Sequence, residues 1–165
     1  MLKVSPSELA KFRRCRRQWA LTYYHRWGVA PEFASATGVA LMGTRIHTAL
    51  EAHYGYGINA VDALNKVYEL EMDKRPDRED DLAGERDTAV IMVGGYLQWA
   101  AENRIDEDYE VVATERTLEV PILLTNGEMA IVSGKLDQIV RRRSDGAILV
   151  RDWKTVGTLH KADMI

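Results

Sequence analysis

The sequence predicts a mixed α/β domain in which helices pack on a β-sheet. Apolar residues recur at helical spacing through about the first two-thirds of the 165 residues. From Tyr109 onward, the pattern changes to strand-like stretches that are separated by turn signals. Because the helices precede the strands and do not alternate with them, we expect them to cover a sheet of antiparallel neighbours. A chain of this length ordinarily forms one domain.

Four helices are expected. The first begins at Ser5–Glu8, a capping box with proline at the first helical position. Its apolar face repeats at helical spacing through Leu9, Phe12, Trp19 and Tyr23. A loop over 28–38 follows, and the later helices are expected over about 39–54, 60–74 and 83–103. Gly55 and Gly57 should end the second helix, and a polar connection over 75–81 should separate the last two.

The strands are expected over 109–120, 128–143 and 147–155. If Asp145 and Gly146 are the central pair of a tight hairpin turn, Lys154 lies directly opposite Asp137 on the neighbouring strand. Asp152 then lies diagonally across from Asp137 on the same face, within side-chain reach. Trp153 should point to the other face and pack under a helix.

This cluster of charges has two interpretations. It is either a cross-strand ion pair at the edge of the sheet or a site for a divalent cation between two carboxylates. Oxygen ligands of this kind suit Mg²⁺ or Mn²⁺, and a lysine beside the ion can act on its bound water or on a phosphate. The spacing alone leaves both interpretations open.

The composition indicates an ordinary globular protein. Hydrophobic residues make up 46% of the chain and the formal net charge is −3. No apolar run approaches the roughly 18 residues of a membrane span, so no membrane partner is expected. The N-terminus lacks the apolar core of a signal peptide. The single cysteine, Cys15, cannot form an internal disulfide, which fits a cytoplasmic location.

The charge is unevenly distributed along the chain. Within residues 1–30 the only acidic residue is Glu8. The basic residues there are Lys3, Lys11, Arg13, Arg14, Arg16, Arg17 and Arg26. Such a segment is either a solvated helix face or a surface that binds phosphates.

Four stretches resemble the PD-(D/E)xK nucleases. GKLDQIV (134–140) followed by ILVRDWKT (148–155) resembles their core, with Asp137 as the first acid, Asp152 as the second and Lys154 as the lysine. SPSELAKFRRCRRQWALTYYHRW, at the N-terminus, resembles the first helix of the RecB-type exonuclease branch and its relatives in CRISPR adaptation and in phages. GTRIHTALE, within the second predicted helix, resembles that branch's Gly-and-His motif.

The resemblance implies a restriction-endonuclease-like core. Its mixed central sheet would carry the site on an antiparallel hairpin, flanked by the N-terminal helices. The whole chain, 1–165, would be a single nuclease domain, and a cytoplasmic one, in the host cytoplasm if a phage encodes it. Because relatives continue into a helix with the pattern QxxxY, the resemblance leaves two alternatives: a domain truncated at its C-terminus, or a minimal form that lacks part of the site.

The resemblance also implies the residues of the site. His47, Asp137, Asp152 and the backbone carbonyl of Trp153 would bind Mg²⁺ or Mn²⁺, and Lys154 would act on the water. Relatives often carry another acid in the preceding strand, where Glu115 and Glu119 share a face, so the choice between them stays open.

The implied function is metal-dependent hydrolysis of DNA, single- or double-stranded, by an exonuclease. The backbone of the DNA would be held by Arg13, Arg14, Arg16 and Arg17. The alternative is a nuclease fold that binds nucleic acid without cleaving it. An iron-sulfur cluster, present in some relatives, needs four thiolates, so Cys15 alone predicts no cluster and is expected in a half-buried core position.

Overall fold

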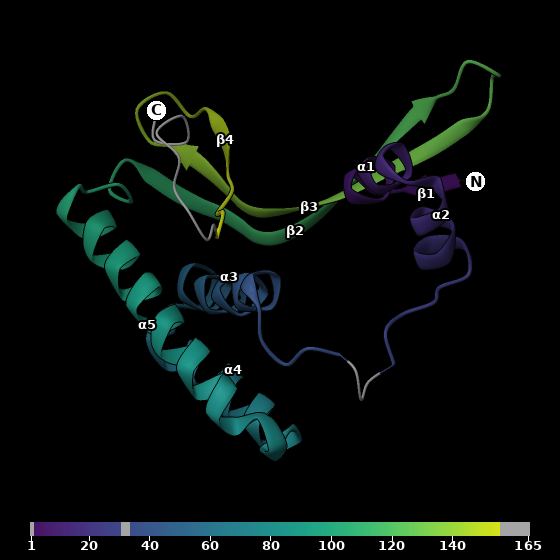
Figure 1. The fold of residues 1–165 in the computed structure, drawn as a ribbon. Helices are drawn as coiled ribbons and strands as arrows, with labels where there is room; N and C mark the ends of the chain where they lie inside the picture. Colours follow the sequence, from purple (N-terminus) through teal and green to yellow (C-terminus); the bar gives the residue numbers. More distant parts are fainter. Residues whose placement is uncertain (1, 31–33, 156–165) are drawn as a thin grey trace. The chain divides into compact units, whose positions relative to one another are not determined.

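The computed structural model describes residues 2–30 and 34–155, so part of the loop expected over 28–38 lies outside the described residues. The chain divides into two compact units (Figure 1). The first unit comprises Met1–Ala34 and Arg116–Leu136, and the second comprises Ser35–Glu115 and Asp137–Ile165. That all 165 residues form one nuclease domain remains a prediction.

The first expected helix is broken at Cys15, which has an extended backbone with φ −157°. The break leaves α1 (Pro6–Arg14), α2 (Arg16–Trp19) and the π-helical turn η1 (Ala20–Tyr24). The Cys15 thiol accepts a hydrogen bond from the Gln18 amide at 3.4 Å and so caps α2. The sequence pattern missed this break because apolar spacing continues across it. Cys15 is exposed, so the prediction of a half-buried core position was wrong.

The start of α1 is confirmed, because the Ser5 hydroxyl accepts a hydrogen bond from the Glu8 amide at 3.1 Å. The aromatic residues then hold the short helices together. The rings of Phe12 and Trp19 pack edge to face with centroids 5.1 Å apart, and the Trp19 indole donates to the Glu8 carboxylate at 3.0 Å.

The sheet has four strands, and β3 (Met129–Arg142) is central to it. Strand β2 (Tyr109–Leu123) lies beside β3, as expected, and β4 (Ile148–Arg151) pairs antiparallel with it. The short strand β1 (Leu2–Val4) pairs parallel with β3 through 130–132 and was not expected, because three residues are too few for a strand pattern. This parallel pair makes the sheet mixed and confirms the predicted fold class.

In the second unit the expected helices are confirmed, with small differences at their ends. Helix α3 (Val39–Tyr56) continues through Gly55 and ends at Gly57, which has φ +70° and the left-handed conformation that glycine favours. Helix α4 (Ala60–Lys74) is capped by the side chain of Asn59. Helix α5 (Glu79–Glu102) begins four residues early because a 3₁₀ turn, η3 (Pro76–Arg78), leads directly into it.

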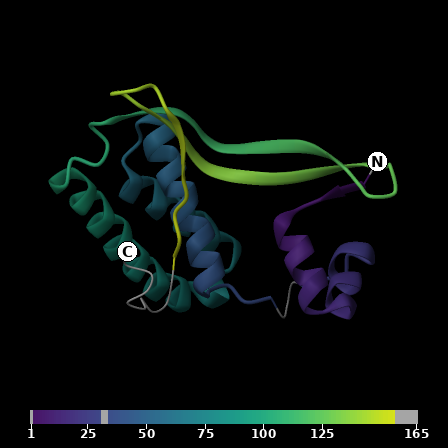
Figure 2. The same cartoon turned by 90° about the horizontal axis from the view of Figure 1, so that it is seen from above.

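These three helices contact one another and enclose the core (Figures 1 and 2). The buried side chains include Ile46, Ala49, Leu50, Leu64, Tyr68, Leu82, Ala89 and Val93. They recur at helical spacing on each element, which is why the sequence pattern predicted these helices.

A buried ion pair links the N-terminal part of α3 to α5 and, through Tyr68, to α4. The Arg45 guanidinium binds the Glu85 carboxylate and also donates to the Ala36 carbonyl at 2.8 Å. Glu85 further accepts from the Tyr68 hydroxyl at 3.0 Å and from the Gly38 amide at 2.5 Å. Because every charge here has several partners, the pair fixes where α3 begins.

The register of the β3–β4 hairpin differs by two residues from the expected register. The prediction that Lys154 lies directly opposite Asp137 was therefore wrong. Gln138 faces Arg151, and the loop contains four residues, 143–146, centred one residue earlier than expected. Gly146 takes φ +74°, and the Asp145 carboxylate binds the Arg142 guanidinium at 2.7 Å. That hydrogen bond lowers the pKa of Asp145 to about 2.

A shift of two residues leaves every side chain on its expected face. Continued one residue beyond its last pair, Gln138 with Arg151, this register puts Asp152, not Lys154, at the level of Asp137. The regular strand also ends at Arg151, and not at Thr155 as expected.

Replacement of Glu85 by alanine should lower the free energy of unfolding by about 3 kcal/mol, because the buried Arg45 guanidinium then keeps only the Glu71 carboxylate, 3.9 Å away. Chemical denaturation followed by circular dichroism measures this change. Glu69→Ala, which removes an exposed ion pair with Lys66, is the matched control and should change stability by less than about 1 kcal/mol. Equal effects of the two substitutions would contradict the structural role of the buried pair.

Candidate metal centre and active site

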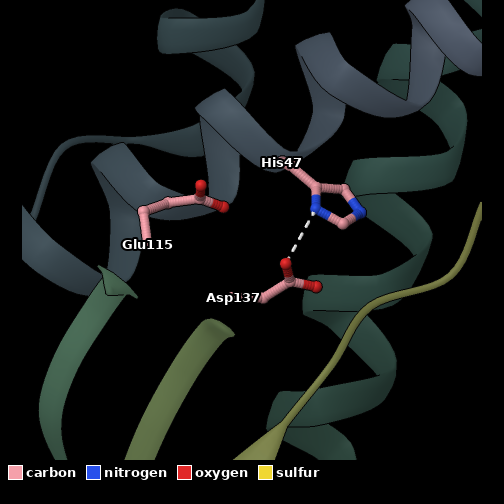
Figure 3. A group of neighbouring side chains, drawn as sticks. All are labelled: His47, Glu115 and Asp137. Carbon is pink, nitrogen blue, oxygen red and sulfur yellow. Dashed lines mark ion pairs between the residues drawn. The ribbon is translucent and has the colours of Figure 1, made fainter. Parts of the chain in front are cut away.

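Three side chains from three different elements converge in the second unit. They are His47 on α3, Glu115 on β2 and Asp137 on β3, and one ligand atom of each lies within 4.8 Å of the other two. Figure 3 shows the two carboxylates and the imidazole directed toward one another. Among the described residues this is the group that could hold a metal ion.

Two glycines of α3 set the position of His47. Gly43 lies one turn before His47, and a Cβ added there would be 3.5 Å from the Thr155 side chain. Gly55 lies about two turns after it, and a Cβ there would come within 2.7 Å of the Thr114 hydroxyl. Helix α3 therefore approaches β2 closely, one residue before Glu115, and also approaches the segment that follows β4.

Glu115 has a strained backbone. Its φ is +50°, in the left-handed region that side-chain-bearing residues rarely adopt, although it lies inside the long strand β2. Such a conformation is unfavourable by about 1–3 kcal/mol and is concentrated at functional sites, where it redirects a side chain. Glu119, the other candidate, instead binds Lys3 in the first unit. The structure therefore brings Glu115, and not Glu119, to His47 and Asp137.

The carboxylate of Asp137 is held from two sides. One oxygen lies 3.3 Å from Nδ1 of His47, and the other accepts a hydrogen bond from the Trp153 amide at 2.8 Å. Asp137 is buried, so these two contacts determine its orientation. The hydrogen bond from the Trp153 amide joins the segment that follows β4 to strand β3.

Asp152 and Lys154 form an exposed pair next to this group. The Lys154 ammonium lies 2.6 Å from the Asp152 carboxylate, and its side chain is 72% exposed. The hydrogen bond from Lys154 lowers the pKa of Asp152, with smaller contributions from Asp137 and His47. Asp152 is nevertheless outside the three-residue group among the described residues.

Trp153 packs against the helical core, as expected. Its ring stacks on Tyr54 with centroids 5.5 Å apart and an interplanar angle of 17°, and it meets His47 edge to face at 6.2 Å. Its indole N–H donates to the Tyr96 hydroxyl at 3.0 Å. The two residues on either side of Trp153, Asp152 and Lys154, are thus anchored by the side chain between them.

A network of tyrosines and charges extends from Trp153. The Tyr54 hydroxyl donates to Asp106 at 2.9 Å and lies 3.2 Å from the Tyr96 hydroxyl, while Arg151 binds the other Asp106 oxygen at 2.6 Å. Burial, first of all, raises the pKa of Tyr54, so the hydroxyl remains a donor. The sequence pattern did not predict this network; the phenolic hydroxyls of Tyr54 and Tyr96 were the available signal.

The four arginines expected to contact DNA lie in the first unit and are exposed. Arg14 donates to Gln18 at 3.3 Å, and the guanidinium of Arg16 lies over the ring of Phe12. Arg13 and Arg17 make no ion pair with another residue in the ranges 2–30 and 34–155.

The donor set fits a divalent cation. Two carboxylates brought together with an imidazole supply hard oxygen ligands and one nitrogen ligand, a combination that suits Mn²⁺ or Mg²⁺. Repulsion between the carboxylates would oppose this arrangement without a positive charge between them. The group has the composition of a metal-dependent hydrolase site that acts on phosphate esters.

Comparison with known families agrees with this class of protein. A family model described as PD-(D/E)XK nuclease superfamily matches residues 3–164, and the chain therefore belongs to that superfamily. Members are metal-dependent nucleases, so the substrate is a nucleic acid. A search among curated proteins found no match. Within the described ranges, no helix combines the length and apolar character needed to cross a membrane.

Binding of Mn²⁺ should raise the melting temperature, because the ion binds the folded state. At about 100 times the dissociation constant the expected gain is roughly 2.7 kcal/mol, or about 5–10 °C. Asp137→Asn should abolish the shift while its amide oxygen can still accept from Trp153. Glu119→Gln, the same chemical change elsewhere on β2, should retain it. Thermal unfolding with and without a chelator measures the effect, and an unchanged shift in Asp137→Asn would exclude this group.

Tyr96→Phe should lower the free energy of unfolding by about 1 kcal/mol, because the indole of Trp153 loses its acceptor and Tyr54 loses a neighbouring hydroxyl. Tyr56→Phe, at an exposed tyrosine of α3, is the control and should change stability by less than about 0.5 kcal/mol. Urea denaturation compares the two variants. A loss no greater than that of the control would mean that the tyrosine network does not anchor Trp153.

Proposed function

We propose that the protein is a DNA nuclease that uses Mg²⁺ or Mn²⁺ and acts as an exonuclease of the RecB-type branch. The observation that carries the proposal is the convergence of His47, Glu115 and Asp137 beside an anchored segment that presents Asp152 and Lys154. The family supplies the nuclease chemistry, and the resemblance of the N-terminal helices and of the GTRIHTALE motif supports the branch.

His47, Glu115 and Asp137 would hold the ion, with Asp152 and the Trp153 carbonyl completing the set from the adjacent segment. When bound, a divalent ion lowers the pKa of a water ligand and offsets the negative charge of the phosphate. The buried position of Asp137 and its hydrogen bond from the Trp153 amide keep one of its oxygens aimed at His47. Glu115 contributes a carboxylate that its left-handed backbone directs inward.

Lys154 is the residue that would act on the substrate. Its ammonium is exposed to solvent and is held near the carboxylates by Asp152, so an incoming phosphate can reach it. A lysine in this position can donate a hydrogen bond to a non-bridging phosphate oxygen and stabilise the negative charge that develops there. It can also orient the attacking water for displacement in line with the leaving oxygen.

The DNA backbone would be bound by the exposed arginines of the first unit. Arg13 and Arg17 are unpaired with other described residues and offer charge to phosphates without reading the sequence. Cleavage of linear DNA but not of circular DNA would identify the protein as an exonuclease.

A second candidate is a nuclease fold that binds nucleic acid without cleaving it. It is favoured by one observation: Lys154 is bound by Asp152, and Asp152 lies outside the three-residue group. In this alternative, binding survives in the presence of a chelator, and no cleavage appears when Mg²⁺ or Mn²⁺ is added.

Asp137→Asn should abolish metal-dependent cleavage of linear DNA, and Lys154→Met should slow it by about 10²- to 10⁴-fold. Lys66→Met is the matched control, because Lys66 is similarly exposed, at 67%, and pairs with a carboxylate as Lys154 does. The Lys66→Met variant should cleave DNA at the same rate as the unaltered protein. Gel analysis of end-labelled DNA with added Mg²⁺ or Mn²⁺ measures the rates, with a chelator as blank.

Retained cleavage in either site variant would remove that residue from the mechanism. Binding by the unaltered protein without any cleavage in either metal would favour the second candidate. Circular dichroism of each variant verifies that the fold is intact before rates are compared.

A further inference from the structure

The first unit carries exposed aromatic side chains directly after η1. Tyr24 is 75% exposed and Trp27 is 66% exposed, and His25 between them is also exposed. Large aromatic side chains are ordinarily buried to a greater extent, because each removes a large apolar area from water. We call Tyr24, His25 and Trp27 the aromatic platform.

The three rings lie next to one another. The rings of Tyr24 and His25 have centroids 5.1 Å apart at an interplanar angle of 86°, and those of His25 and Trp27 are 5.2 Å apart at 35°. Tyr24 meets His25 edge to face and Trp27 is tilted against it, so the rings form a cluster in which Tyr24 and Trp27 are largely open to solvent. Such a cluster is suited to flat, unpaired rings that can stack on it.

The backbone holds this arrangement in place. The His25 amide donates to the Ala20 carbonyl at 2.9 Å, and the Trp27 amide donates to the Leu21 carbonyl at 2.8 Å. Arg26 between them has φ +54°, a left-handed conformation that residues with a side chain rarely adopt, just after the end of η1. The π-helical turn that precedes it is a rare element, and such elements are frequent at functional sites.

The charge around the platform favours a polyanion. In residues 2–30 seven basic side chains accompany Glu8, which is the only acidic residue there and is bound by the Trp19 indole. The guanidinium of Arg16 and the ammonium of Lys11 lie over aromatic rings of the same unit, at 5.4 Å from Phe12 and 5.6 Å from Tyr23. Basic and aromatic groups alternate along this unit, as in surfaces that bind both phosphates and bases.

We propose that the aromatic platform binds single-stranded DNA by stacking on its unpaired bases while the neighbouring arginines bind its phosphates. This deepens the proposed function and rests on it, because it assigns the strandedness of the substrate. Bases inside a duplex are already stacked on one another and cannot reach the rings. A duplex would therefore contact the arginines only.

The test measures binding by the full chain in the presence of a chelator, so that cleavage does not contribute. Fluorescence anisotropy would follow a labelled oligothymidine of about 20 nucleotides, a duplex of the same length, and an abasic strand with the same phosphates. Trp27→Ala and Tyr24→Ala should each weaken binding of the oligothymidine by about 5- to 100-fold. Binding of the duplex and of the abasic strand should change less than about twofold. Trp27→Phe, which keeps a π-face, should bind almost normally.

Two exposed aromatics of the second unit are the matched controls. Tyr56 is 73% exposed and Trp99 is 50% exposed, and Tyr56→Ala and Trp99→Ala should leave binding of every probe unchanged. Equal loss of oligothymidine binding in these controls, or no loss in the platform variants, would overturn the proposal. Equal weakening for the abasic strand would also overturn it, because stacking needs bases. Melting temperatures verify that each variant is folded.

The two proposals fail separately. If the unaltered protein cleaves DNA but the platform variants bind the oligothymidine normally, the nuclease function stands and the platform does not. If platform-dependent binding is found without any metal-dependent cleavage, the platform stands and the nuclease proposal fails.

Discussion

The carboxylate of Asp137 is the point on which the rest of the site depends. It is buried, lies beside the imidazole of His47, and accepts the amide hydrogen of Trp153. Through these contacts it connects helix α3, the central strand β3 and the segment that follows β4. A buried carboxylate is unfavourable unless hydrogen bonds and opposite charge surround it. The convergence of these elements supplies the hydrogen bonds, and the donor set that results is the one that divalent cations favour.

The surrounding structure limits the freedom of this carboxylate. Gly43 and Gly55 let α3 approach its neighbours closely, and Trp153 is fixed by stacking on Tyr54 and by its bond to Tyr96. Trp153 lies between Asp152 and Lys154 and is partly buried against the core, so the two exposed charges project from an anchored segment. Catalytic side chains must be held to within a fraction of an ångström, and packing of this kind provides the constraint.

Local sequence patterns predicted much of the fold, and the predictions that were wrong failed for physical reasons. Helices α3, α4 and α5 were predicted because their apolar faces are long and end at clear caps, such as Asn59 and Gly57. Strand β1 was missed because three residues carry no period, and its pairing partner is distant in the sequence. The hairpin register was wrong because the position of the loop depends on Gly146 and on the Asp145–Arg142 contact, and not on the turn dipeptide alone.

The sequence by itself determined the class of fold and the helices of the second unit, because periodicity is a local property, and residue chemistry supplied candidates for a metal site. It also gave the face on which Asp137 and Asp152 lie, since an even shift of register preserves the faces of a strand. Only the tertiary structure decided between Glu115 and Glu119, through a backbone conformation that no residue pattern encodes. It likewise paired Lys154 with Asp152 and joined the tyrosine network to Trp153, because those contacts join segments far apart in the chain or depend on where β4 ends.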